Sequence, residues 1–232
     1  LMLEPLMPAP LAVVIPALEE AQRLPLLLAD LATAPAGLIR ERLVVDGGSR
    51  DDSAALARLG GADVLESPAG RGRQLQRGIA ASTAPWLLLL HADARLPPGW
   101  ANAVQRAING GAAAGSCAWC FDLAVDGRHL PLLELAVALR SRLGQCPYGD
   151  QGLLLPSQLY AAAGGFAPIP LMEDLDLVQR LRPLTRLRCL QQPLRVDGRR
   201  WRELTRSTTE VEDGAIAFQG IDSIEPIDVN GV

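Results

Sequence analysis

The chain contains no lysine, so all 22 of its basic residues are arginine. Mutational bias is the simpler explanation of this composition, but a planar guanidinium also suits a phosphate ligand, because it can donate two parallel hydrogen bonds. The arginines form no dense basic block of the kind that tracks a nucleic-acid backbone. We therefore expect no nucleic-acid partner.

Long hydrophobic runs are also missing. No apolar run approaches the ~18 residues that a membrane-spanning helix needs. The first ten residues hold Glu4 and three prolines but no basic residue, which is unlike a secretory signal peptide. These features predict a soluble, cytoplasmic protein without a transmembrane segment.

Cysteine is scarce, with four residues at positions 117, 120, 146 and 189. The spacing Cys117-Ala-Trp-Cys120 could belong to a zinc or redox site. However, this segment has the pattern of a strand, in which positions i and i+3 point to opposite faces. No second closely spaced pair follows, so we expect thiols that are buried for packing.

The totals are those of a globular chain with one sizeable core: 232 residues, 49% hydrophobic and 21% charged. Charge is unevenly spread, since residues 203–232 hold seven acids and one arginine. We expect one domain over residues 1–202 and an acidic C-terminal extension over 203–232, which could be ordered or flexible.

Short apolar runs alternate with helical patterns in the first half. The expected strands cover residues 11–15, 42–45, 62–67 and 86–90, and the expected helices follow them at 17–34, 51–60, 70–82 and 97–108. The second half is less regular, with an apolar strand expected at 113–127, a helix at 130–144, a loop entering a strand at 148–156, a short helix after Pro156 and a helix at 171–182. This order predicts an α/β fold with a single, mostly parallel, twisted sheet flanked by helices.

Polar clusters follow three of the expected strands. Glu19-Glu20 follows the first strand, Asp46 the second, and His91-Ala92-Asp93 the fourth. The carboxyl ends of parallel strands meet along one edge of a sheet, where ligands of open α/β proteins bind. The sequence therefore predicts a ligand crevice at this edge.

His91 and Asp93 share a face at strand spacing. An aspartate oxygen suits Mg²⁺ or Mn²⁺, which usually take one or two protein carboxylates together with phosphate oxygens and water, and histidine tolerates Mn²⁺ better than Mg²⁺. The alternative is purely structural: Asp93 could cap the next helix and His91 could pack against a neighbour.

Two further motifs fit a nucleoside diphosphate. Asp46 in "VVDGGSRDDS" could accept a hydrogen bond from a nucleobase or ribose, or it could simply cap the turn. Arg71 and Arg73 in "GRGRQLQRG" could bind a diphosphate at a helix start, or form a solvated face. The glycine spacing matches neither a Rossmann fingerprint nor a Walker motif.

The segment "PLMEDLDLVQRL" opens a helix with Glu173, Asp174 and Asp176. Acids in a first turn are favoured by the helix dipole alone. If Asp174 or Glu173 faces the crevice, it could instead act as a general base. The sequence alone does not decide between a helix-capping role and a catalytic role for these acids.

Six segments together resemble family 2 glycosyltransferases of the GT-A fold, the nucleotide-diphospho-sugar transferase fold. They occur in the family's order over residues 11–202: "VVIPALEE", "VVDGGSRDDS", "GRGRQLQRG", "LLLLHADARLP", "YGDQGLLL" and "GGFAPIPLMEDLDLVQRL". The chain looks most similar to a small bacterial subgroup that also carries His-Ala-Asp.

The resemblance implies an inverting, metal-dependent transfer of a sugar from a nucleotide-diphosphate-sugar to an acceptor hydroxyl. The implied roles are as follows: Pro16, Glu20 and Asp46 line the nucleoside pocket; Arg71 and Arg73 lie near the diphosphate; Asp93, with His91, binds Mn²⁺ or Mg²⁺; Asp174, with Glu173, contains the catalytic base; Asp150, Arg200 and Trp201 lie near the acceptor or close over the site.

The chain departs from the family in three places. Glu19 stands where the family usually has asparagine, and His91 replaces the first acid of the commoner Asp-x-Asp motif. An acidic tail replaces an apolar segment that some relatives carry, although a lipid-linked acceptor stays compatible with the sequence. Two alternatives remain open: a nucleotidyltransferase, disfavoured by the acidic, glycine-free loop after the first strand, and a non-catalytic nucleotide-sugar binding module.

Overall fold

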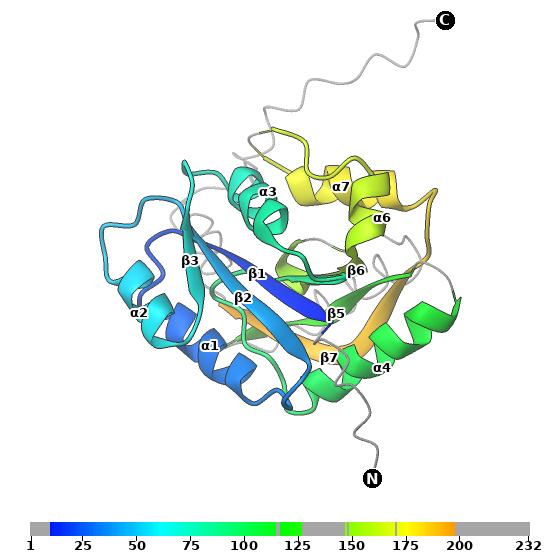
Figure 1. Cartoon of the computed structure of the whole chain (residues 1–232), viewed down its shortest axis with the longest axis horizontal. Helices are drawn as coiled ribbons and strands as arrows, with labels where there is room; N and C mark the ends of the chain where they lie inside the picture. The colour runs from blue at the N-terminus through cyan, green and yellow to red at the C-terminus, as the bar shows by residue number, and fades with distance from the viewer. Residues whose placement is uncertain (1–9, 115–116, 127–146, 148, 170, 198–232) are drawn as a thin grey trace, which may run out of the picture. The chain divides into compact units, whose positions relative to one another are not determined.

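A computed structural model describes residues 10–114, 117–126, 147, 149–169 and 171–197 (Figure 1). Its helices are α1 (Leu24–Ala32), α2 (Ser53–Leu59), α3 (Arg71–Ala81), α4 (Trp100–Ala114), α6 (Ser157–Ala162) and α7 (Glu173–Leu181), with a 3₁₀ turn η1 at Gly149–Gln151. Its strands are β1 (Leu11–Ala17), β2 (Ile39–Asp46), β3 (Asp63–Glu66), β4 (Trp86–Leu89), β5 (Ala118–Asp126), β6 (Leu153–Pro156) and β7 (Leu187–Asp197).

The strands form one sheet in the order β3-β2-β1-β4-β6-β5-β7. Neighbouring strands pair in parallel except at β6, which is antiparallel to both β4 and β5. Six of the seven strands therefore point the same way, as the sequence predicts. The carboxyl ends of β1, β2 and β4 consequently lie at a common edge, next to the start of the reversed strand β6.

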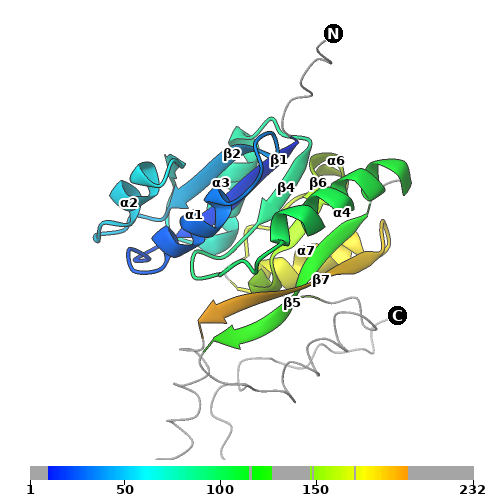
Figure 2. The same ribbon diagram turned by 90° about the horizontal axis from the view of Figure 1, so that it is seen from below.

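Helices cover both faces of the sheet, so the described part has three layers. Alternate β1 residues face opposite sides: Val13 and Ile15 pack with α1 and α4, while Ala12 and Val14 pack with α3, α6 and α7. Figures 1 and 2 show the same division, with α1, α2 and α4 on one face and α3, α6 and α7 on the other. Both faces of β1 are apolar because both are covered.

The regular first half of the sequence predicts the structure well, and the second half less so. The four expected strands and the helices α2 and α3 are confirmed within three residues. Helix α1 begins only at Leu24, because residue 17 still belongs to β1, and α4 runs on to Ala114. The strand expected from residue 113 is wrong at its start, because α4 runs through Gly110 to Ala114 and β5 begins at Ala118. The three alanines 112–114 favour continuing the helix over starting a strand.

Strand β7 is not predicted from the sequence. Its centre reads Gln191-Gln192-Pro193, which interrupts the apolar alternation that signals a strand. Gln191 has a positive φ of 56°, and the register against β5 shifts between Cys120 and Asp122. The strand thus contains a bulge-like irregularity. An extra residue in a strand interrupts the alternation of apolar and polar residues, so the sequence pattern does not predict the strand. The helix expected at 130–144 lies outside the described residues.

The cysteines behave as packing residues. Cys117 and Cys120 are buried, and Cys117 packs in the apolar cluster with Trp119. Cys120 lies opposite Cys189 on the neighbouring strand β7, with 3.7 Å between the two sulfurs. The hydrogen bond with Cys189 and burial both raise the pKa of the Cys120 thiol far above its usual value. Cys146 lies outside the described residues.

Gly78 on α3 provides a test of the helix-to-sheet packing. A Cβ at this position would collide with the side chain of Val14 and lie 2.9 Å from Cγ2 of Val45. Overpacking costs ~1–3 kcal/mol, which exceeds the ~1 kcal/mol that alanine gains in helix propensity. We expect Gly78→Ala to lower the free energy of unfolding in urea. Gly110→Ala in α4, where a Cβ meets nothing within 4 Å, should raise it; equal behaviour of the two variants would contradict the packing.

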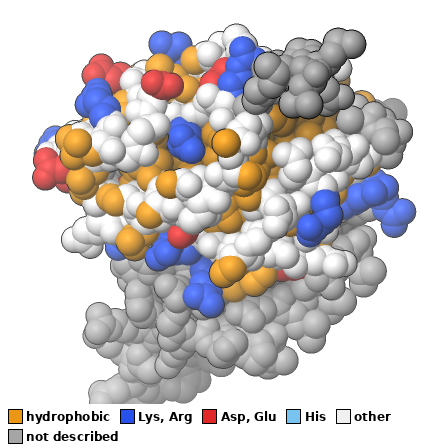
Figure 3. Space-filling view, turned by 60° about the horizontal axis from the view of Figure 1, so that its bottom comes forward, with side chains coloured by type: hydrophobic (Ala, Val, Ile, Leu, Met, Phe, Trp, Pro, Cys, Tyr) orange, Lys and Arg blue, Asp and Glu red, His pale blue; other side chains and the backbone are white. Residues whose placement is uncertain are grey.

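Among the described residues, no helix is both long and apolar enough to cross a membrane. On the face that comes forward in Figure 3, hydrophobic side chains are exposed across the middle, and arginine and acidic side chains lie mainly toward the edges.

Candidate functional site

Arg71 joins helices α3 and α7 at the centre of the candidate site. Its Nε donates a hydrogen bond to Oε1 of Glu173, and its Nη2 lies 3.8 Å from Oδ1 of Asp174. The Glu173 side chain is only 3% exposed, whereas that of Asp174 is 17% exposed. A buried carboxylate needs such a partner, because an unpaired charge away from water is very costly. Glu173 is thus buried in an ion pair with Arg71, whereas the carboxylate of Asp174 stays partly exposed to the crevice.

His91 and the turn η1 complete the same cluster. His91 Nε2 lies 3.4 Å from Nη1 of Arg71. The backbone N–H of Gly149 donates to Oδ2 of Asp174 over 2.5 Å. A Cβ on Gly149 would lie 2.7 Å from that oxygen and 3.1 Å from His91 Nε2, so a glycine is required where the turn passes between the two side chains. Segments from β4, α3, η1 and α7 therefore meet at one point.

The charges of this cluster act on Arg71. Burial by itself would lower the pKa of the guanidinium, but the hydrogen bond and charge of Glu173, with the charges of Asp174 and Asp150, outweigh it and raise the pKa. Arg71 therefore stays a cation at any working pH. Asp150, in the turn η1, is the third carboxylate whose charge raises the pKa of Arg71.

A pocket opens beside the cluster, with an empty volume of about 440 Å³ that includes open solvent. Arg71, His91, Gly149 and Asp174 form its polar part. The remaining wall is mainly apolar and comes from α3, β4, β6, α7 and the segment between α6 and α7. It includes Leu75, Leu89, Leu153, Phe166, Leu177 and Val178. A few converging polar groups in an apolar concavity are the usual composition of a small-molecule site.

A second polar group gathers at the ends of β1 and β2. The backbone N–H groups of Glu19 and Glu20 donate to the hydroxyls of Ser49 and Ser53, over 3.0 and 2.7 Å. Asp46 is 7% exposed, and its carboxylate accepts from the N–H groups of Gly48 and Ser49 (3.1 Å each) and from the Ser49 hydroxyl (2.5 Å). Asp46 thus organises its own turn, which was the structural alternative for this residue.

The other residues predicted to bind the donor lie around the same strand ends and at the start of α3. Pro16 is the next-to-last residue of β1, and the carboxylate of Glu20 accepts from Nη1 of Arg23 over 3.3 Å. Arg73 is exposed in the first turn of α3. Arg71 lies in the same turn but reaches the acids of α7. The binding roles of these residues stay predictions.

Glu19 has an unusual backbone conformation. Its φ is 56°, in the left-handed region where asparagine is several-fold enriched over most residues. Its carboxylate accepts from the N–H of Arg50 over 2.6 Å. The asparagine that the family resemblance predicts here would suit this backbone, whereas the glutamate contacts the loop after β2.

The loop with the proposed metal ligands, residues 91–95, has both buried and partly exposed side chains. His91, Asp93 and Arg95 are partly exposed and alternate with buried Ala92 and Ala94. The Ala94 N–H donates to the His91 carbonyl over 3.1 Å, so residues 91–94 form a turn and do not continue the strand β4. The shared face of His91 and Asp93 stays a prediction.

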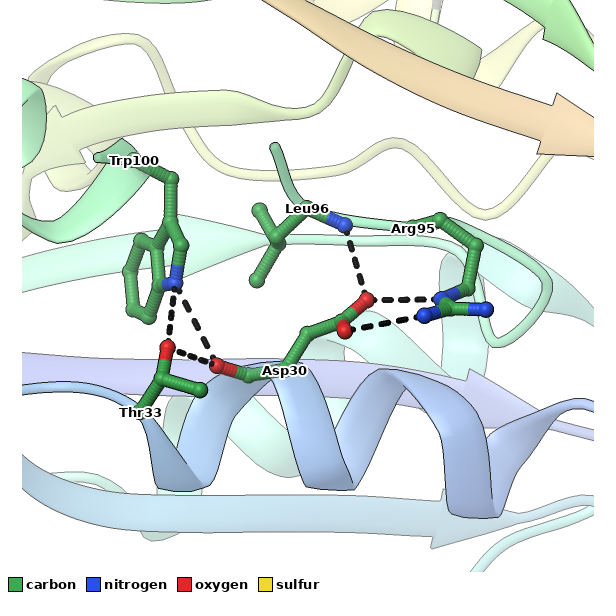
Figure 4. Close-up of polar contacts among 5 residues, drawn as sticks. All are labelled: Asp30, Thr33, Arg95, Leu96 and Trp100. Carbon is green, nitrogen blue, oxygen red and sulfur yellow. Dashed lines mark hydrogen bonds and ion pairs between the residues drawn. The ribbon is translucent and has the colours of Figure 1, made fainter. Parts of the chain in front are cut away.

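Asp30 on α1 anchors this loop (Figure 4). Its carboxylate accepts from Nε of Arg95 over 2.7 Å, from Nη2 of Arg95 over 3.1 Å and from the Leu96 N–H over 3.0 Å. The indole of Trp100 donates to the Asp30 carbonyl and to the Thr33 hydroxyl, each over 3.3 Å. The segment after Asp93 is thus fixed to α1 by charge-assisted bonds.

In the described part of the chain, no three histidine, cysteine, aspartate or glutamate side chains come together as a metal cage. Mg²⁺ and Mn²⁺ held between a protein and a diphosphate need only one or two protein ligands. Asp93, on the partly exposed side of its loop, supplies an oxygen donor of the right kind. The residues present thus fit a metal that shares its coordination with a bound nucleotide.

Comparison with known proteins identifies the family. Residues 12–168, more than half of the chain, match the model of glycosyl transferase family 2. The chain belongs to this family. Curated relatives of this family 2 chain include uncharacterised glycosyltransferases of Mycobacterium bovis and Mycobacterium tuberculosis, each 40% identical over 88 residues. The match covers 38% of this chain and 38% of each relative.

Solved structures show the same fold. Glucosyl-3-phosphoglycerate synthase from Mycobacterium tuberculosis, in complex with Mn²⁺, uridine diphosphate and glucosyl-3-phosphoglycerate, is 23% identical and has a TM-score of 0.62. That likeness covers 88% of this chain and 77% of the synthase. TarS from S. aureus, in complex with UDP, is 16% identical with a TM-score of 0.62, covering 84% and 63% of the two chains. The predicted GT-A fold is confirmed.

Sequence reasoning missed three parts of this family 2 site. The Gly149 backbone bond to Asp174, the anchoring of the loop by Asp30, and the hydrogen bonds of Gln74 to two strand ends all depend on tertiary contacts between distant segments. The predicted closing residues Arg200 and Trp201 lie outside the described residues.

Proposed function

We propose that the protein is an inverting glycosyltransferase that moves a sugar from a nucleotide-diphosphate-sugar to an acceptor hydroxyl. The observation that carries the proposal is the meeting of Arg71, His91 and the acids of α7 at the carboxyl ends of the parallel strands. Family membership and the fold support it. Neighbours in the same fold are crystallised with UDP and with Mn²⁺ or Mg²⁺, which makes these the first ligands to try.

The two acids of α7 have different roles in this proposal. Asp174 lines the pocket and has one oxygen fixed by the Gly149 N–H. It is therefore placed to take the proton that the acceptor hydroxyl loses during attack. Glu173 is buried against Arg71 and acts as a positioning residue that keeps the guanidinium beside Asp174.

The departing nucleoside diphosphate gains negative charge, which Arg71 and Arg73 stabilise from the start of α3. Asp93, with His91 beside it, would hold Mn²⁺ or Mg²⁺ on the diphosphate, and the ion would supply further charge stabilisation. Pro16, Glu20 and Asp46 border the nucleoside. Asp150, Arg200 and Trp201 are proposed to contact the acceptor or to close over the site.

We also propose that the catalytic domain extends to residue 202, with the acidic segment 203–232 outside it, and that the chain belongs to the subgroup with a His-Ala-Asp motif. The acceptor is left open. Phosphoglycerate accompanies the neighbouring synthase, and a lipid-linked hydroxyl is the second class to test.

The proposal is tested by thermal unfolding with UDP, GDP, CDP and dTDP and their common sugars, each with and without Mn²⁺ or Mg²⁺. A ligand at ~100 times its Kd adds ~2.7 kcal/mol, which for a chain of this size raises the Tm by roughly 5–10 °C. We expect a metal-dependent rise that one base produces most strongly. If no nucleotide raises the Tm, the donor site is wrong.

Binding and turnover measurements on the same protein distinguish the two alternatives from a glycosyltransferase. A nucleotidyltransferase would bind a nucleoside triphosphate and release pyrophosphate. A non-catalytic nucleotide-sugar binding module would show the metal-dependent rise in Tm but no sugar release that depends on Asp174. The match to a glycosyl transferase family favours transfer over both.

A further inference from the structure

Gln74 is a buried polar side chain that does not line the pocket. It lies on α3 one helical turn after Arg71 and is only 3% exposed. Burying an amide costs free energy unless its polar atoms are hydrogen-bonded. A leucine could fill the same position without that requirement, so the amide points to a specific contact.

The amide of Gln74 contacts the carboxyl ends of β1 and β2, which are proposed to bind the sugar donor. Its Nε2 donates to the carbonyl of Ala17, the last residue of β1, and to that of Val45, next to the end of β2, over 2.8 Å each. The Gly47 N–H also donates to the Ala17 carbonyl, over 2.9 Å. A Cβ on Gly47 would lie 3.1 Å from Nε2 of Gln74, so the turn after β2 passes close over the amide.

These bonds connect three parts of the proposed donor site. The loop with Glu19 and Glu20 follows Ala17, and the turn organised by Asp46 follows Val45. Arg71 and Gln74 are three residues apart on α3 and so lie on one side of the helix. One side chain thus holds the start of α3 in register with both loops.

We propose that Gln74 is a positioning residue for the donor: it fixes the diphosphate-binding start of α3 relative to the nucleoside-binding ends of β1 and β2. The inference rests on the proposed function. Without the amide, the carbonyls of Ala17 and Val45 lose this donor and α3 can shift along the strands. A misplacement of about 1 Å can cost on the order of 100-fold in an enzyme site.

The test compares Gln74→Met, which keeps the length of the side chain and removes the donor, with the wild type. Amide hydrogen exchange is measured without ligand on peptides covering residues 17–23 and 45–53. The Kd of UDP with Mn²⁺, or of the diphosphate that the wild type prefers, is measured by calorimetry. We expect exchange to become at least about tenfold faster in both peptides and the Kd to rise by a similar factor, as a misplaced site requires.

Two further variants separate positioning from lost stability. Ile108→Val removes one buried methyl group in α4, on the other face of the sheet, and should leave exchange in both peptides and the Kd unchanged. Gln74→Asn keeps an amide that is one methylene too short to reach both carbonyls. It should act in the same direction as Gln74→Met, and it is the variant to use if Gln74→Met does not fold.

The exchange rates and the Kd together decide whether Gln74 positions the donor site. Unchanged exchange in both peptides overturns the proposal, and so does faster exchange with an unchanged Kd in a protein whose wild type binds nucleotide. If the wild type binds no nucleotide, the proposed function fails, while the exchange data still show whether Gln74 holds the two loops.

Discussion

Replacing Asp174 by asparagine is expected to leave donor binding intact and to lower turnover by ~10²–10⁴-fold, the range that a general base contributes. The amide keeps the size of the side chain, and its one oxygen can still accept the N–H of Gly149. The Leu175 N–H, which donates to Oδ1 of Asp174 over 2.9 Å, then loses that acceptor. The nearby charge of Arg71 stays paired with Glu173. What is lost is the proton acceptor that faces the pocket, so the effect should fall on kcat and not on the Kd of the donor.

Asp176→Asn is the matched control for this prediction. Asp176 lies in the same first turn of α7, but it pairs with Arg180, whose Nε lies 3.1 Å from Oδ2 of Asp176. The variant removes the same charge from the same helix end without touching the pocket. Turnover is followed as release of nucleoside diphosphate with the donor found by thermal unfolding. Wild-type turnover in Asp174→Asn would exclude this residue as the base.

Glu173 and Asp174 show where the sequence stops being informative. Both precede Leu175 at a helix start, and the pattern alone cannot tell which of them faces the crevice. The structure separates them because Glu173 is buried against Arg71 and Asp174 lines the pocket. That difference depends on how α7 packs against α3, and the two helices are about a hundred residues apart in the chain.

The sequence predicts the strand ends well for a physical reason. An apolar run that stops at a charged residue marks the point where a buried strand leaves the core, so Asp46 and His91 could be placed at one edge of the sheet before the fold was known. Gln74 could not be found in the same way. A single glutamine in an amphipathic helix carries no signal, and its role depends on two carbonyls contributed by other segments.

Asp93→Ala is expected to abolish the metal-dependent part of nucleotide binding. A diphosphate carries several negative charges, and Arg71 is already shared with the acids of α7. In the proposed function, a divalent ion balances the remaining charge of the diphosphate and takes a carboxylate oxygen from Asp93. We expect the extra rise in Tm that Mn²⁺ gives with the preferred diphosphate to disappear, while a smaller, metal-independent rise from the arginines and the nucleoside contacts remains.

The control and a second substitution make this test specific. Asp63→Ala removes an exposed carboxylate at the first residue of β3, the opposite end of the parallel strands, and should keep the full rise with Mn²⁺. His91→Asp restores the commoner Asp-x-Asp pattern and should improve the response to Mg²⁺ relative to Mn²⁺, since a hard cation prefers oxygen to nitrogen. An unchanged affinity for the diphosphate with Mn²⁺ in Asp93→Ala would remove Asp93 from the metal site.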